Sequence, residues 1–256
     1  MKNILNKIYI HPFFLLTVLM FVLIGRFKFL ICFMVLILVH ELGHIIISLM
    51  FKWRVDKIIV LPFGGITKYN EIINRPLIEE FLVAISGIII QLIFYKLVSN
   101  YIDYKFFSFI NYFIIIFNLL PIYPLDGSKI LNVLFNKITN FKNSILFTVI
   151  ISYVCIIDLS LLLFNINKLL FMMLIFLFIE VNKYYKEKYL LFNKFLLERY
   201  LYNLKFTKEK IINNVDKMKK DYRHIFYIDN KYMTESTFLK TIYEGNYTFD
   251  RFTILW

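Results

Sequence analysis

Residues 29–51 read FLICFMVLILVHELGHIIISLMF, an apolar run that carries two histidines and one glutamate, His40, Glu41 and His44. A transmembrane helix needs about 20 mostly apolar residues, so the run is long enough to cross a bilayer. Ionisable side chains at that depth are costly, face protein or water, and mark a functional site by default. The stretch therefore predicts a membrane helix that carries a polar site.

The spacing of the three ionisable side chains is that of a metal site. On a helix, His40 and His44 are four residues apart and share one face, so both imidazoles can point at one metal ion. Glu41 follows the first histidine and can serve as the general base for a metal-bound water, which is the His-Glu-x-x-His pattern of zinc metalloproteases. The alternative is a set of buried residues that are neutralised without any function.

Catalytic zinc takes three protein ligands and leaves a fourth position open, so a third ligand is expected elsewhere. Asp126 is the best candidate, because it ends the apolar stretch NLLPIYPL, in which Pro121 and Pro124 prevent a regular helix and free backbone groups toward a cavity. An ordinary helix-end turn is the alternative for this Asp-Gly pair. The weaker rival carboxylates are Asp103, Asp158 and Glu180.

Composition supports a membrane protein. The chain is 59% hydrophobic with a mean hydropathy of +0.65, whereas soluble domains are about 45–50% apolar. Lys and Arg gather at the N-terminus, in residues 52–76, in the 127–142 loop and in the tail, which places both termini in the cytoplasm and explains the net charge of +12 without nucleic acid. Six spans are expected, at about 9–25, 29–51, 77–98, 106–125, 143–164 and 168–182.

Two segments are not expected to span the membrane. Residues 55–67 alternate weakly and then meet Pro62, Gly64 and Gly65, which predicts a short strand and a turn that dips toward the membrane; an ordinary interfacial loop is the alternative. Residues 183–256 change in composition and predict an amphipathic helix, a polar stretch, a strand at Tyr222–Ile228, a turn at Asp229-Asn230 and a helix from about Thr234 to Gly245.

The expected fold is therefore an all-α polytopic membrane protein with about six transmembrane helices and one membrane-dipping loop. Residues 1–182 form the transmembrane domain, and residues 183–256 form a small cytosolic α+β module. The charge run of this module is interpreted as a solvated face near anionic lipid.

Three sequence motifs carry a resemblance to the site-2 protease family of intramembrane zinc metalloproteases. They are the His40–His44 motif, the stretch Leu61–Gly65, and the segment from Asn118 to Gly127. The resemblance covers about residues 1–200. It implies that His40, His44 and Asp126 bind one zinc ion and that Glu41 activates water. It further implies that Asn118, Pro121 and Pro124 line the substrate cleft, with Gly64 and Gly65 in a loop beside it.

The same resemblance implies a substrate and partners. The substrate would be a membrane-associated precursor, a sporulation sigma-factor pro-sequence, cut in the mother-cell membrane around the forespore. Small inhibitory membrane proteins would regulate the cleavage, and an oligomer is compatible with the sequence. Two departures stand out: Ser86-Gly87-Ile88 replaces the Gly-Pro step of many relatives, and Gln91 stands where a histidine can occur. The tail is also shorter than the nucleotide-binding CBS-type domain of some relatives, and as a truncated remnant it is not expected to bind ATP independently.

Two other classes of function fit parts of the sequence. A metal-ion transporter could use His40, His44 and Asp126 to pass an ion, and a catalytically inactive scaffold could bind a partner without cutting it. The substitution Glu41→Gln would distinguish a transporter from a hydrolase. A transporter could tolerate it, whereas a hydrolase would lose turnover and keep its metal. A scaffold has no chemical need for all four residues, so the sequence favours the zinc protease.

Overall fold

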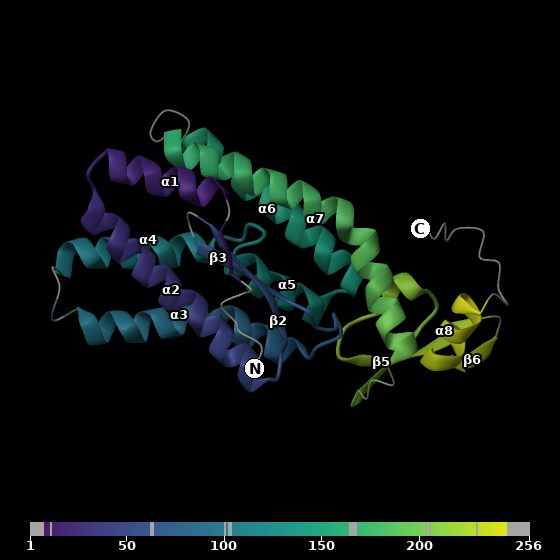
Figure 1. Ribbon diagram of the computed structural model, residues 1–256. Helices are drawn as coiled ribbons and strands as arrows, with labels where there is room; N and C mark the ends of the chain where they lie inside the picture. The colour runs from purple at the N-terminus through teal and green to yellow at the C-terminus, as the bar shows by residue number, and fades with distance from the viewer. Residues whose placement is uncertain are drawn as a thin grey trace.

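The computed structural model describes residues 8–10, 12–61, 64–99, 101, 104–163, 168–202, 204, 206–228 and 230–244. Most of them are helical, and two small sheets complete the fold (Figure 1). The helices that build the body are α1 (Pro12–Leu23), α2 (Phe27–Met50), α3 (Leu77–Val98), α4 (Tyr104–Leu119), α5 (Asp126–Ile138), α6 (Phe141–Leu163) and α7 (Lys168–Leu201).

Three of these helices are long and apolar enough to cross a membrane, counted over the described residues: α2, α3 and α6. Helix α4 is apolar but has only 16 residues. Helix α1 has 12 residues, about 18 Å at 1.5 Å per residue, which is short of a hydrocarbon core about 30 Å thick. The expectation of six spans therefore stays a prediction. Helices α2, α3 and α6 account for three of these spans.

The N-terminal part of the first expected span differs from the prediction. Residues Ile8–Ile10 form strand β1, which pairs in parallel with strand β2 (Val55–Leu61). Helix α1 starts only at Pro12, a residue that helices accept in their first turn because its missing N–H would have no partner there. The predicted helix at 9–25 is thus a strand followed by a shorter helix.

The expected loop at residues 127–142 is also different, because residues Asp126–Ile138 form helix α5. Its buried residues include the polar Ser128 and Asn136 together with the apolar Val133, while charged residues lie near both ends. Ile130, Leu134 and Ile138 recur at helical spacing, a pattern that predicts a helix, but the lysines of the segment favour its interpretation as a loop. It packs between α3 and α6, in the middle of the body (Figure 1).

The segment after α2 contains two paired strands in place of the single short strand that the sequence predicts. Strand β2 pairs antiparallel with β3 (Gly64–Tyr69), with Val60 opposite Gly65, and the sheet order is β1-β2-β3. The run Lys57–Leu61 is rich in β-branched residues, which fit a pleated surface. Pro62, in the predicted turn, falls outside the described residues. Strand β3 packs against α2 and so brings this β2–β3 hairpin next to the His-Glu-x-x-His motif.

The C-terminal residues form a small α+β unit at the end of α7. Strand β5 spans Tyr222–Ile228, as predicted, and helix α8 spans Glu235–Tyr243, close to its predicted bounds; Asp229 of the predicted turn falls outside the described residues. Helix α7 runs without a break through the predicted domain boundary at 182–183. The remaining elements, which the sequence did not reveal, are β4 (Lys208–Ile212), the short 3-10 helix η2 (Val215–Lys217) and β6 (Lys231–Thr234).

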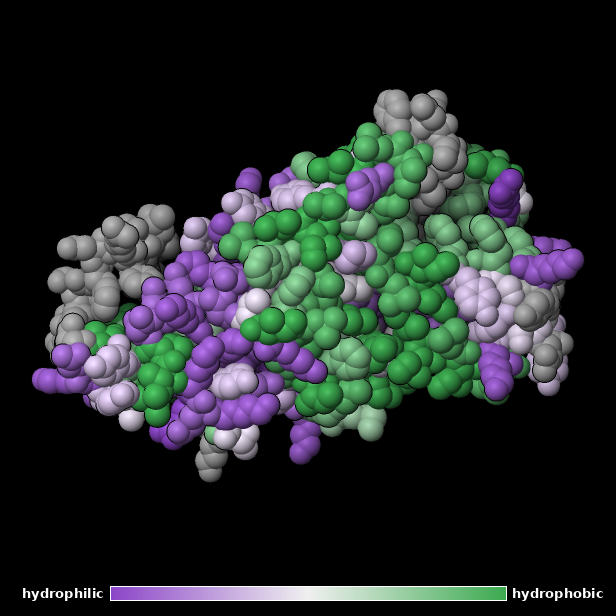
Figure 2. Space-filling model, turned by 180° about the vertical axis from the view of Figure 1, so that it is seen from behind, coloured by the Kyte–Doolittle hydropathy of each residue, from purple (hydrophilic) through white to green (hydrophobic). Residues whose placement is uncertain are grey.

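The surface separates into an apolar body and a polar end. Figure 2 shows hydrophobic side chains over the helical body and hydrophilic ones at the end where the C-terminal unit lies. In the most apolar windows of α2, α3 and α6 only 44%, 39% and 28% of positions are buried within the protein. Many of the others are large apolar side chains that face outward, a pattern that requires lipid around these helices.

Candidate metal centre

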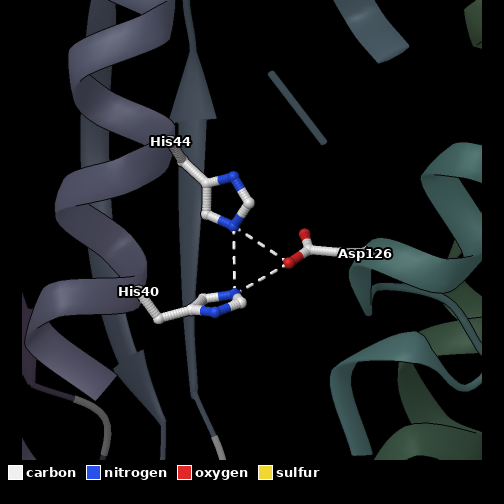
Figure 3. Close-up of side chains that lie close together, drawn as sticks. All are labelled: His40, His44 and Asp126. Carbon is white, nitrogen blue, oxygen red and sulfur yellow. Dashed lines mark hydrogen bonds and ion pairs between the residues drawn. The ribbon is translucent and has the colours of Figure 1, made fainter. Parts of the chain in front are cut away.

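The two motif histidines lie on the buried face of α2. His40 and His44 are 1% and 4% exposed, and their Nε2 atoms lie 3.1 Å apart. Both rings extend from one side of the helix, as Figure 3 shows. This is the arrangement that a spacing of four residues on a helix predicts.

Asp126 completes the cluster from the other side. It is the first residue of α5 and is 3% exposed, and its Oδ2 lies 2.9 Å from Nε2 of His40 and 2.9 Å from Nε2 of His44 (Figure 3). The three candidate ligand atoms lie within 4.8 Å of one another. Among the described residues, the structure thus brings together the three side chains that the sequence singled out. The rival Asp158 is exposed on α6, and Asp103 falls outside the described residues.

The other ring nitrogens determine what the site can bind. Nδ1 of His40 lies 2.9 Å from the Oε1 of Gln91, and Nδ1 of His44 lies 2.7 Å from the carbonyl oxygen of Val83. Because both partners are acceptors, each Nδ1 carries the proton and each Nε2 presents a lone pair. Two lone pairs and one carboxylate oxygen then converge in a buried space, and a cation at their centre relieves that repulsion. The donor set of two imidazoles and a carboxylate fits zinc.

Gln91 explains one departure from the family pattern. Its side chain is fully buried on α3, and besides accepting from His40 it donates to the side-chain oxygen of Asn111 on α4 at 3.0 Å. The amide therefore fixes both the orientation and the tautomer of His40. A glutamine at this position is thus compatible with the metal centre.

Gly87 explains why the centre can form between α2 and α3. A Cβ at this position would lie 2.5 Å from Nε2 of His44 and 2.8 Å from Nε2 of His40, closer than real Cβ atoms come to a neighbour. A residue without a side chain lets the backbone of α3 approach both imidazoles. The segment Ser86-Gly87-Ile88, the second departure, therefore keeps the residue that the packing requires.

Glu41 is held by the β2–β3 hairpin. Its Oε1 accepts from the backbone N–H of Gly65 at 2.8 Å, and its Oε2 accepts from the hydroxyl of Thr67 at 3.0 Å. The residue is 6% exposed, so these bonds supply the partners that a buried charge requires. The hairpin thus positions the candidate general base, and Gly65 contacts Glu41 directly.

Of the residues predicted to line a substrate cleft, Asn118 lies in the last turn of α4, and Pro121 and Pro124 lie in the connection that leads from α4 to Asp126. The amide of Asn118 donates to the carbonyl of Ile114 one turn earlier, and the carbonyl of Pro121 accepts from the hydroxyl of Ser152. Pro124 follows a cis peptide bond and is buried. These contacts shape the approach to Asp126, and the roles in substrate binding remain predictions.

A cavity of about 240 Å³ lies next to the metal centre. It lies between β3, α3 and α5, with Tyr184 of α7 at its wall, and its lining includes residues that the sequence does not single out. Lys129 is the most notable, because its Nζ lies 2.8 Å from Oδ1 of Asp126. A lysine three residues after an aspartate is common on helix surfaces, so the sequence alone does not single out Lys129. The contact becomes notable because Asp126 is buried. Other lining residues are His44, Thr67, Tyr69, Tyr123 and Tyr184.

The remaining histidines and cysteines lie away from the centre. His224 is buried on β5 and bonded to Glu235, while His11 falls outside the described residues. Cys32 and Cys155 are half-buried free thiols on α2 and α6, and each packs against a cluster of buried apolar side chains.

A buried His-His-Asp centre, a glutamate beside it and a membrane-helical body together are the arrangement of a membrane-embedded zinc metallopeptidase. The same fold is found in a solved structure described as Site-2 Protease from Methanocaldococcus jannaschii, with a TM-score of 0.57 and 24% identity, covering 69% of this chain and 89% of that one. The chain belongs to peptidase family M50, whose model matches residues 28–102 and 98–164.

Two curated relatives are consistent with membership of the chain in peptidase family M50. The chain is 39% identical over 150 residues to Stage IV sporulation protein FB of Bacillus subtilis (strain 168), a match that covers 56% of this chain and 52% of that protein. It is 29% identical over 110 residues to Zinc metalloprotease MJ0392 of Methanocaldococcus jannaschii, covering 40% of this chain and 32% of that protein. The chain thus spans about half or less of the length of these relatives.

Proposed function

We propose that this chain is an intramembrane zinc metalloprotease that cuts a membrane-associated precursor. The observation that carries the proposal is the convergence of His40, His44 and Asp126 next to Glu41, inside helices that require lipid around them. Membership in peptidase family M50 supports the same activity. The mechanism assigns the three ligands to one zinc ion and the general base to Glu41.

Zinc held in such a site is a Lewis acid that lowers the pKa of a water molecule to about 7 and polarises a carbonyl. His40 and His44 supply neutral Nε2 donors because their Nδ1 protons are bonded elsewhere. Glu41 takes the proton of the attacking water and returns it to the leaving amine. The Gly65 N–H and the Thr67 hydroxyl orient its carboxylate for both transfers.

The substrate must reach the centre in an extended conformation, since a helical peptide keeps its carbonyls bonded internally. Strand β3 is at the edge of its sheet, and it carries Gly65 beside Glu41. If the substrate added as a further strand along β3, the carbonyl groups of the substrate would face the metal centre. Gly64 and Gly65 are accordingly proposed as substrate-binding residues, with Asn118, Pro121 and Pro124 lining the rest of the cleft.

For the substrate we propose a sporulation sigma-factor precursor. The family resemblance of the sequence implies it, and a relative named for stage IV of sporulation matches over 150 residues. The proposed location is the mother-cell membrane around the forespore, with both termini cytoplasmic and with small inhibitory membrane proteins as partners. The clustering of Lys and Arg outside the expected spans supports this orientation.

Co-expression with candidate sigma-factor precursors from the same genome tests the proposal. Wild type should shorten one precursor, whereas Glu41→Gln should lower the cleavage rate by at least about 100-fold while the purified protein keeps its zinc. Glu209→Gln, which changes an exposed glutamate of β4, is the matched control and should cleave normally. Cleavage that persists in Glu41→Gln would exclude Glu41 as the base, and a transport activity that persists there would favour the transporter.

A further inference from the structure

The two oxygens of the Asp126 carboxylate have different partners. Oδ2 lies 2.9 Å from both histidine Nε2 atoms, while Oδ1 lies 2.8 Å from Nζ of Lys129. Lys129 follows Asp126 by three residues on α5, so the first turn of that helix brings the ammonium to the carboxylate. One oxygen faces the metal centre, and the other is occupied by a cation of the protein itself.

This division matters because a carboxylate can bind a metal through one oxygen or through both. A catalytic zinc site has three protein ligands and needs an open fourth position. If Asp126 used both oxygens, the second would compete with water for that position. A charge-assisted hydrogen bond from Lys129 to Oδ1 is among the stronger hydrogen bonds in proteins and makes this second donation unfavourable.

We propose that Lys129 is a positioning residue that restricts Asp126 to a single zinc-binding oxygen and so keeps the fourth position open for water. The proposal rests on the proposed zinc-protease function. The ion pair is partly shielded from solvent, because the Asp126 side chain is 5% exposed although the Lys129 side chain is 40% exposed. Lys129 also lines the cavity that His44 lines, so a substrate that entered this cavity would contact it.

Cobalt(II) in place of zinc gives a readout that does not depend on turnover. Four-coordinate cobalt absorbs visible light strongly, and an added ligand weakens and shifts this absorption. The full-length wild type and Lys129→Arg should give the strong four-coordinate spectrum. Lys129→Met should give a weaker, shifted spectrum and about 10–100-fold slower precursor cleavage, the size typical for loss of a residue that supports a metal ligand.

Lys137→Met is the matched control, because Lys137 is exposed in the last turn of the same helix and should leave spectrum and cleavage unchanged. If Lys129→Met does not fold, Lys129→Ala takes its place with the same expected change.

A four-coordinate spectrum in the folded Lys129→Met or Lys129→Ala protein would overturn the positioning role. If wild type gives a four-coordinate spectrum but cuts no precursor, the proposed function fails while the spectra still decide the role of Lys129; if wild type binds no cobalt, both are overturned.

Discussion

At the scale of single residues, each metal-facing side chain has a second contact that fixes it. Gln91 holds His40, the carbonyl of Val83 holds His44, and Lys129 holds Asp126. Losing such supporting contacts typically costs about 10–100-fold in metal affinity or activity. The site therefore depends on residues that do not touch the metal.

Gly87→Ala tests how tightly the two helices must approach. The added methyl group would lie 2.5 Å from Nε2 of His44, so it would push an imidazole out of the site. We expect zinc affinity, measured by competition with a chelator, to fall by at least about 10-fold. Ile89→Ala is the control on the same helix, because Ile89 is 47% exposed on its outer side and should not affect zinc. Unchanged affinity in Gly87→Ala would show that α3 can move away from the centre.

The sequence pointed to the candidate metal ligands but not to the residues that support them. His40, Glu41 and His44 are close in sequence, and the helical spacing alone places the histidines on one face. Asp126 was found by the requirement for a third ligand at membrane depth. The supporting roles of Gln91 and Lys129 come from contacts between α2, α3 and α5 that only the tertiary structure defines.

At the scale of elements, the proposed mechanism makes the β2–β3 hairpin a link between substrate binding and the general base, because Gly65 and Thr67 both contact Glu41. Gly65→Val would place a Cβ 2.5 Å from Cδ of Glu41 and would crowd the edge of β3. We expect precursor cleavage to slow by at least about 10-fold, because both Glu41 and an added substrate strand are displaced. Zinc stoichiometry should stay unchanged, since His40, His44 and Asp126 all lie on helices.

The matched control for the hairpin is Lys68→Gln, a change on the same strand. Lys68 is exposed on β3, so the loss of its charge leaves the contacts of Glu41 in place. We expect this variant to cleave the precursor at the wild-type rate. Normal cleavage by Gly65→Val would remove the hairpin from the proposed substrate site.

The elements that the sequence predicted well are those with one dominant pattern. The apolar runs gave α2, α3 and α6, and the β-branched run gave β2. Helix α5 was missed because its lysines favoured a loop although its apolar residues have helical spacing, and β1 was missed because its short apolar sequence merges with that of α1. For β1 the deciding partner, β2, is distant in sequence.

At the scale of the whole molecule, the C-terminal unit is attached to the start of α3, the helix that supports both histidines. The Oδ2 of Asp221 accepts from the N–H of Leu77 at 3.2 Å, and Lys220 pairs with Glu80. Arg199 at the end of α7 donates to Glu235 of this unit at 3.0 Å. The C-terminal unit is therefore fixed to the same helix whose Val83 and Gln91 hold the two histidines.

Acid should loosen this unit. Burial lowers the pKa of His224 from its ordinary 6.5. Burial raises the pKa of Glu235, but the hydrogen bond from His224 and the charge of Arg199 outweigh this and bring it below its ordinary 4.5. Both groups bind fewer protons in the folded state than in the unfolded state, so their stabilising contribution is present above pH 6.5 for His224 and above pH 4.5 for Glu235, and is lost as the pH falls.

Hydrogen-exchange protection of residues 206–244, corrected for intrinsic rates, should fall as the pH is lowered from about 7.5 to about 3.5. Glu235→Gln should flatten the acid end of this profile, because its side chain no longer titrates. Arg199 and Lys210 are the other charged groups that face this pair, Arg199 acting on both residues and Lys210 on His224. Protection that rises on acidification would contradict the assignment of these pKa shifts.

The zinc content of the purified full-length protein tests the central claim most directly. The account predicts about one zinc per chain in wild type and in Glu41→Gln, and a loss of most of the zinc in His40→Ala and in Asp126→Ala. A folded wild type without zinc, or full zinc occupancy in His40→Ala, would contradict the metal centre formed by His40, His44 and Asp126.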